Sequence, residues 1–247
     1  MHRWCIVSPY ASQVRTELAL ATRQSEQLLV SLGIPLLVLV FFSLVDVVPV
    51  PTADAVDYVA PATLALAVMS TAMVSLGIGT GFERQYGVLK RLGASPLGTT
   101  RWVAAKTTLV VLTEVVQVAV LVAVAFGLGW RPPVTGWPEA IGGLALGTLA
   151  FAGLGLLLAG TLPGLATLAI TNGLYLVLLL TGGMIVPIDD LPSWLANIAR
   201  LLPAAALVEV TTGSLVAGGE VGGWAWITLA VWATAGPLAA ARWFRWS

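Results

Sequence analysis

The longest charge-free stretch of the sequence, from Ala140 to Ile188, runs for 49 residues without Asp, Glu, Lys or Arg. As one α-helix it would be about 73 Å long at ~1.5 Å per residue. That is more than twice the ~30 Å of hydrocarbon that a membrane helix has to cross, so the stretch has to fold back. Pro163 and Gly164 mark the turn, because proline removes a helix hydrogen bond and glycine is a poor helix former. Two membrane helices are therefore predicted, at 140–161 and 165–186.

Four further apolar stretches have the length of a membrane span: 28–48, 58–81, 107–129 and 221–241. Hydrophobic residues make up 58% of the chain and charged residues only 10%, against about 25% charged residues in soluble domains. So few charges could not cover the surface of a soluble domain of 247 residues, which excludes a soluble enzyme. The sequence predicts an all-α polytopic membrane protein with six transmembrane helices.

The distribution of lysine and arginine predicts the orientation of these helices. With both termini on the inside, ten of the twelve Lys and Arg residues fall in inner segments, and only Arg131 and Arg200 fall outside. Positive charge is enriched in cytoplasmic loops. We therefore expect a multi-pass protein of the plasma (inner) membrane with both termini in the cytoplasm.

Residues that commonly carry chemistry are scarce in this chain. Cys5 and His2 are the single cysteine and the single histidine, which excludes a Cys/His metal site. The sequence contains no G-x-x-x-x-G-K-[ST] motif, the loop that cradles nucleotide phosphates. Glu114 is the one charge in the middle of a predicted span, so no pair of acids is available for catalysis. We expect no catalytic residue and no metal site.

The N-terminal segment 1–27 has the pattern of an amphipathic helix. Val14, Leu18 and Ala21 recur at about helical spacing, while Glu17 and the arginines of the segment are predicted to point elsewhere. Such a helix would lie on the inner membrane surface. A solvated, loosely helical tail is the alternative interpretation.

The inner loop 82–106 is basic and contains a second amphipathic pattern. Tyr86, Leu89 and Leu92 would share one face of a helix, with charged residues on another face. The helix should stop near Ala94, because Pro96 disfavours helical geometry at the residue before it. A plain basic loop that obeys the positive-inside rule is the alternative.

Glu114 lies about two turns inside the span 107–129, where a charge costs on the order of 2.5–3.5 kcal/mol. Gln117 follows three residues later and should share its face. These two residues are candidates for a polar contact that lines a transport route or a dimer seam. A structural hydrogen bond between helices is the alternative.

The outer connection 187–220 is too short and too charged to form a further span. Its leucines and Trp194 fit helical spacing, with Pro187, Pro192 and Pro203 as interruptions. We expect short extracellular or re-entrant helices here.

Two of these segments resemble signatures of the permease subunits of type-2 ABC exporters, particularly the small drug- and lipid-exporting members. The first, after the second helix, reads Phe82-Glu-Arg-Gln-Tyr-Gly-Val-Leu-Lys-Arg-Leu-Gly-Ala-Ser-Pro-Leu. The second, between helices five and six, consists of Gly183-Met-Ile-Val-Pro187 followed by Leu191, Pro192, Trp194 and Pro203. The resemblance covers essentially the whole chain, so residues 1–247 would form a single type-2 ABC transmembrane domain.

The resemblance implies partners and a coupling element. A second permease subunit would complete a homo- or heterodimer in the lipid membrane, and a cytoplasmic ATPase subunit would bind ATP and Mg, leaving this chain without a cofactor. A cytoplasmic coupling helix between helices two and three would dock on the ATPase. The residues expected to form it are Glu83, Arg84, Tyr86, Gly87, Leu89, Lys90, Arg91, Leu92, Ser95 and Pro96.

The expected function is export of hydrophobic or amphipathic compounds, either drug efflux of the kind that gives antibiotic resistance or lipid export. Nothing in the chain argues for nucleic-acid binding, since its net charge is zero. Three alternatives stay open at this point: a polysaccharide-exporting permease of related architecture, a secondary transporter outside the ABC class, and a structural or assembly membrane protein without transport.

Overall fold

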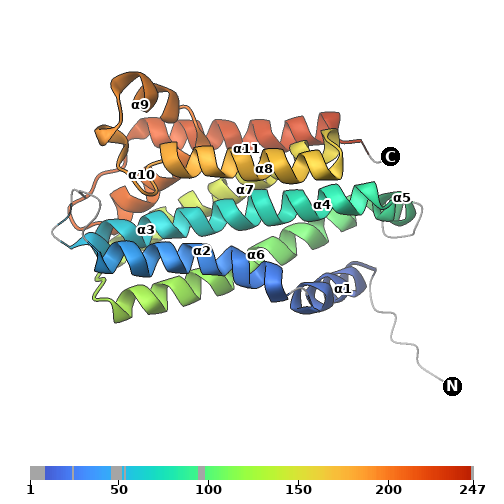
Figure 1. Ribbon diagram of the computed structural model, residues 1–247, viewed down its shortest axis with the longest axis horizontal. Coiled ribbons are helices and arrows are strands. Elements are labelled where there is room, and N and C mark those ends of the chain that lie inside the picture. Colours follow the sequence, from blue (N-terminus) through green and yellow to red (C-terminus); the bar gives the residue numbers. More distant parts are fainter. Residues whose placement is uncertain (1–8, 24, 46–51, 53, 94–97, 246–247) are drawn as a thin grey trace.

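The computed structural model describes residues 9–23, 25–45, 52, 54–93 and 98–245, and within them the chain is a bundle of helices without strands (Figure 1). The helices of the first half are α1 (Pro9–Arg23), α2 (Ser25–Leu44), α3 (Ala55–Val68), the π-helix η1 (Met69–Ser75), α4 (Leu76–Gln85), α5 (Val88–Gly93) and α6 (Gly98–Gly127). Those of the second half are η2 (Val134–Gly136), α7 (Trp137–Thr161), α8 (Gly164–Thr181), η3 (Ile188–Asp190), α9 (Ser193–Ala199), α10 (Pro203–Leu215) and α11 (Gly223–Trp243).

Five helices of the described chain are long and apolar enough to cross a membrane. They are Ala55–Gln85, Arg101–Gly127, Val134–Thr161, Gly164–Thr181 and Gly223–Trp243. The prediction of an all-α polytopic membrane protein is therefore confirmed.

The first predicted span, 28–48, corresponds to α2, and the part of α2 from Ser31 to Leu44 is an apolar helix. Residues 46–48 of that prediction lie outside the described residues. The third predicted span, 107–129, is part of a longer helix, because α6 starts at Gly98, where a helix leading into that span was expected after Pro96. Helix geometry continues through the basic residues since nothing between Gly98 and Thr107 breaks a helix.

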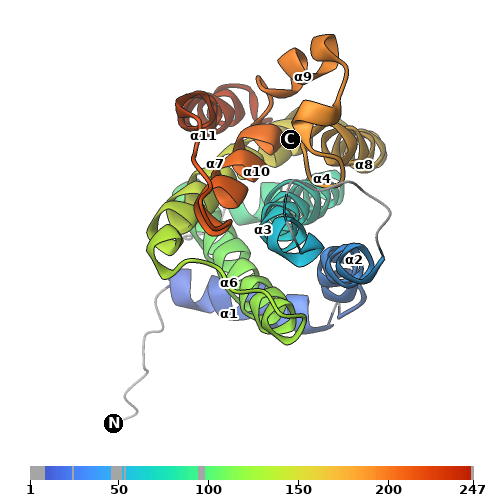
Figure 2. The same cartoon turned by 90° about the vertical axis from the view of Figure 1, so that its left-hand side faces the viewer.

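The helix formed by α3, η1 and α4 is the centre of the bundle. It is buried along most of its length, whereas the other spans each keep much of their surface exposed. Viewed along the bundle, α2, α6, α7 and α8 surround it (Figure 2). This arrangement agrees with its sequence, because a helix that is apolar on all sides is stable only when other helices cover it.

Small residues allow the helices to approach closely around this centre. A Cβ atom on Gly155 of α7 would lie 2.7 Å from the backbone oxygen of Met73, and one on Gly77 would lie 3.1 Å from Gly155 Cα. On the opposite side of α7, Gly153 meets the backbone of Gly236 in α11. Glycine at such crossings is typical of helix packing in membranes.

The two ends of the bundle are built from different short helices. One end, named here the α5 end, contains α1, α5 and the last turn of α11 (Figure 1). Helix α1 lies across the bundle rather than along it (Figure 2). Its Leu18 is exposed and its Val14 is partly buried. The side chain of Ala21 lies outside the described part.

The opposite end, named the α9 end, is built by the connection between α8 and α11. Helices α9 and α10 meet at an angle of 88°. Helix α9 stays at the surface, and α10 turns back into the bundle, where most of its residues are buried against α3, α7 and α11. The connection therefore contains one surface helix and one helix that re-enters the bundle.

Candidate functional site at the α5 end

The segment expected to form one coupling helix is two helices joined by a turn. Helix α4 ends at Gln85, and Gly87 has a φ of +70°, a left-handed conformation that glycine adopts readily. The six-residue helix α5 follows. The expectation of one helix from Phe82 to Ala94 is therefore wrong, because the left-handed conformation of Gly87 interrupts the helix.

This turn separates side chains that were expected to share a face. Tyr86 is 70% exposed, whereas Leu89 is 1% exposed and packs with Trp102 of α6 and Phe244. Leu89 was expected to belong to the helix that docks on the ATPase, but its side chain is packed inside this chain and is not available to a partner. The face that α5 leaves exposed carries Val88, Lys90 and Arg91. Ser95, Pro96 and the side chain of Leu92 lie outside the described residues.

Glu83 belongs to a buried ion-pair cluster at the base of the central helix. Lys106 Nζ lies 2.5 Å from Glu83 Oε1 and 2.8 Å from Glu17 Oε2. Gln13 donates a hydrogen bond of 2.8 Å to the other oxygen of Glu17. The cluster joins α1, α4 and α6, and at least three-quarters of each charged side chain is buried.

The role of Glu17 was not visible in the sequence, where Glu17 was placed on the solvated side of α1. In the structure Glu17 is 4% exposed and faces α6. No local signal connects Glu17 with Lys106, which follows 89 residues later. Burial of the Glu17 carboxylate costs free energy, and the ammonium group of Lys106 offsets that cost.

Arg84, also expected on a docking surface, is turned inward. Its guanidinium donates hydrogen bonds to the carbonyl oxygens of Gly160 and Leu162, the latter at 2.6 Å. These carbonyls lie at the end of α7, where helix carbonyls lack partners and carry partial negative charge. Arg84 therefore attaches the end of α4 to the turn between α7 and α8.

Comparison with known protein families decides what kind of protein carries this site. Residues 11–216 match the family model described as ABC-2 type transporter. The chain belongs to the ABC-2 transporter family. No curated protein sequence gives a significant match. The chain is thus the membrane permease of an ABC transporter, a transport subunit and not a catalytic one, and the resemblance to type-2 ABC permeases is confirmed.

Within this ABC-2 permease, the two polar residues of the third span contact different helices. The hydroxyl of Thr148 in α7 donates to Glu114 Oε2 at 2.7 Å, and Glu114 Oε1 is buried without a hydrogen-bond partner in the described chain. Gln117 instead accepts from the hydroxyl of Thr71 in η1 at 2.7 Å and donates to Ser31 of α2 at 3.3 Å. Both residues thus connect helices inside one chain.

Gln117 is expected to stabilise the central part of the permease. Replacing it with leucine removes the acceptor of Thr71 and the donor to Ser31, and interhelical hydrogen bonds in membranes contribute about 0.6–1.7 kcal/mol. We expect Gln117→Leu to lower the free energy of unfolding in detergent by about 1 kcal/mol. Asn172→Leu is the control, because Asn172 is exposed and its amide donates to Leu168 of its own helix. Equal stability of the two variants would contradict this role.

The signature residues of the outer connection lie at the α9 end of the permease, where the prolines precede or open its short helices. Pro187 precedes η3, Pro192 precedes α9, and Pro203 is the first residue of α10. Leu191 lies between η3 and α9, and Trp194 is 65% exposed. Proline fits these positions because the first turn of a helix needs no backbone donor.

Proposed function

We propose that this permease is the membrane subunit of an ATP-driven exporter of hydrophobic or amphipathic compounds, drugs or lipids, and that a separate ATPase subunit docks at the α5 end. The single observation that carries the proposal is the exposed face of α5. Lys90 and Arg91 project from a helix whose opposite side is anchored by Leu89 against Trp102, and the exposed Tyr86 lies in the turn that precedes this helix. In this arrangement ATP and Mg bind to the ATPase subunit and not to the permease.

The contacts behind α5 suit a part that transmits movement. Leu89 connects α5 to α6, Lys106 connects α6 to α1 and α4, and Arg84 connects α4 to the end of α7. A displacement of α5 would thus reach four longer helices as a rigid-body motion, the kind of motion that packed helices pass on. A flexible loop would absorb it.

The proposal includes the orientation and the assembly of the permease. The α5 end and both termini would face the cytoplasm of a plasma membrane, in agreement with the position of ten of the twelve Lys and Arg residues. A second permease subunit, identical or different, would complete the transport route. An apolar route without mid-span charges other than Glu114 favours apolar cargo.

Transport in proteoliposomes tests this function. We expect the permease, co-purified with its ATPase from native membranes, to accumulate an apolar fluorescent dye or a labelled phospholipid only with ATP. The variant Tyr86→Ala/Lys90→Ala/Arg91→Ala should lower ATP-driven transport at least tenfold without changing the yield of folded permease. The control is Val134→Ala, because Val134 is 84% exposed and its neighbour Gly136 packs against Ser214 of α10, far from α5 in the fold. Transport without ATP, or unchanged transport by the triple variant, would contradict the proposal.

A further inference from the structure

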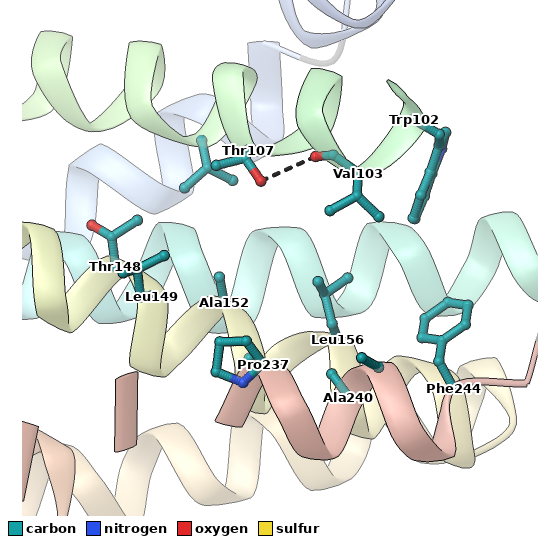
Figure 3. A pocket seen from close by; sticks show the side chains of 13 residues that line it. Trp102, Val103, Thr107, Thr148, Leu149, Ala152, Leu156, Pro237, Ala240 and Phe244 are labelled. Carbon is teal, nitrogen blue, oxygen red and sulfur yellow. Dashed lines mark hydrogen bonds between the residues drawn. The ribbon is translucent and has the colours of Figure 1, made fainter. Parts of the chain in front are cut away.

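A cavity of about 550 Å³ opens between α6, α7 and α11 in the half of the bundle next to the α5 end. Side chains from all three helices line it, with Trp102 and Phe244 at one end and Thr148 at the other (Figure 3). Its volume falls within the ~300–1,000 Å³ of typical small-ligand sites.

The hydroxyl groups that line the cavity already donate hydrogen bonds within the permease, so they do not need a polar ligand. The hydroxyl of Thr107 donates to Val103 O at 3.0 Å, and that of Thr148 donates to Glu114 Oε2 at 2.7 Å. The rest of the lining is mostly aliphatic, with Leu156 and Pro237 as examples. A hydrocarbon chain fits such walls, since an apolar cavity favours an apolar ligand over water.

The length and position of the cavity match one leaflet of a bilayer. From Trp102 to Val110 along α6 the helix rises about 12 Å, close to half of the ~30 Å hydrocarbon thickness. At the α5 end the rings of Trp102 and Phe244 lie 6.4 Å apart, and the neighbouring Trp243 is 60% exposed. Exposed tryptophan is enriched at the depth of lipid headgroups. The cavity thus runs from headgroup depth toward the bilayer centre.

Positive charge lies at the headgroup end of the cavity. Arg242 and Arg245 are exposed, and each directly follows a lining residue, Ala241 and Phe244. The acids of the neighbouring cluster, Glu17 and Glu83, are both paired with Lys106. An anionic headgroup beside these arginines would be attracted, and a cationic one repelled.

We propose that this cavity binds one acyl chain of an anionic phospholipid from the surrounding bilayer, with its phosphate beside Arg242 and Arg245. The site is lined by residues of α6, α7 and α11 and by the adjoining Phe244. None of them belongs to the exposed face of α5, and the proposal does not depend on the identity of the exported compound.

Native mass spectrometry of the full-length permease tests the proposal with phosphatidylglycerol and phosphatidylcholine as probes. We expect one retained phosphatidylglycerol per chain, in several-fold preference over phosphatidylcholine. Ala241→Phe, which fills the cavity, should lower retention at least fivefold. Ala235→Phe is the matched control, because Ala235 is an exposed residue of α11 that does not line the cavity.

Arg242→Gln/Arg245→Gln should remove the several-fold preference for phosphatidylglycerol, while one lipid per chain is still retained. Arg131→Gln, near the α9 end, should keep the preference. Retention by Ala241→Phe at the wild-type level, or a preference that survives loss of both arginines, would overturn the proposal.

A second measurement needs no variant and so does not depend on the folding of Ala241→Phe. Phosphatidylglycerol with a photoreactive group in its acyl chain, in nanodiscs of the wild-type permease, should label peptides that contain 102–110 and 237–244. Labelling spread evenly over the exposed faces of α2, α8 and α11, or equal labelling by the phosphatidylcholine analogue, would overturn the proposal.

Discussion

Lys106→Met is expected to destabilise this permease by about 3–5 kcal/mol, the cost of leaving a buried charge without its partner. The substitution replaces the lysine stem with an unbranched apolar side chain and removes the ammonium group that lies 2.8 Å from Glu17 and 2.5 Å from Glu83. Two acids would then face each other in a buried position, and α1 would lose its ionic attachment to α6. Unfolding in detergent, followed by circular dichroism, measures the change.

Two comparisons separate the ion cluster from a general effect of lost charge. Lys90→Met removes an exposed lysine of α5, and surface substitutions usually change stability by less than about 0.5 kcal/mol. Glu17→Gln/Glu83→Gln/Lys106→Met removes all three charges and should recover most of the loss, because a neutral cluster leaves no unpaired ion. If Lys106→Met and Lys90→Met unfold alike, the cluster contributes nothing to stability.

Gly153→Ala is expected to cost about 1–3 kcal/mol, the range for overpacking a tight core. A Cβ atom at this position would meet backbone atoms of Gly236 and Pro237 in α11. Because the obstacle is backbone, no side chain can rotate away, and α7 and α11 would have to separate. The same measurement of unfolding tests this expectation.

Gly79→Ala provides the matched control for this contact. A Cβ atom on Gly79 of α4 has nothing within 4 Å, and alanine is favoured over glycine in helices by about 1 kcal/mol. Gly79→Ala should therefore be neutral or stabilising in the experiment that shows a loss for Gly153→Ala. A loss of the same size at both positions would contradict the packing role of Gly153, because a Cβ atom on Gly79 meets no obstacle.

The membrane class and the main helices could be predicted from the sequence, because span length and breaks are local properties. Forty-nine uncharged residues have to turn once, and the chain turns at Leu162–Pro163, between α7 and α8. The family was also recognisable, since its two signatures are continuous stretches of sequence.

The contacts of the side chains at the α5 end could not be predicted without the tertiary structure. Whether Leu89 faces a partner or Trp102 depends on the turn at Gly87 and on the path of α6. Gly87, a glycine inside a helical pattern, is a signal for a helix break. The sequence does not show in which direction the helix after the break runs. Arg84 binds Gly160 and Glu17 binds Lys106, 76 and 89 residues away along the chain, and no periodicity in the sequence encodes such contacts.

Site-specific photocrosslinking tests the central claim most directly, that the α5 end binds the ATPase. A photoreactive amino acid at Lys90, an exposed position of α5, is compared in native membranes with the same probe at Val134, near the α9 end. The account predicts an adduct from Lys90 to a polypeptide with a nucleotide-binding G-x-x-x-x-G-K-[ST] loop, and none from Val134. An adduct with that polypeptide from Val134 alone would contradict it.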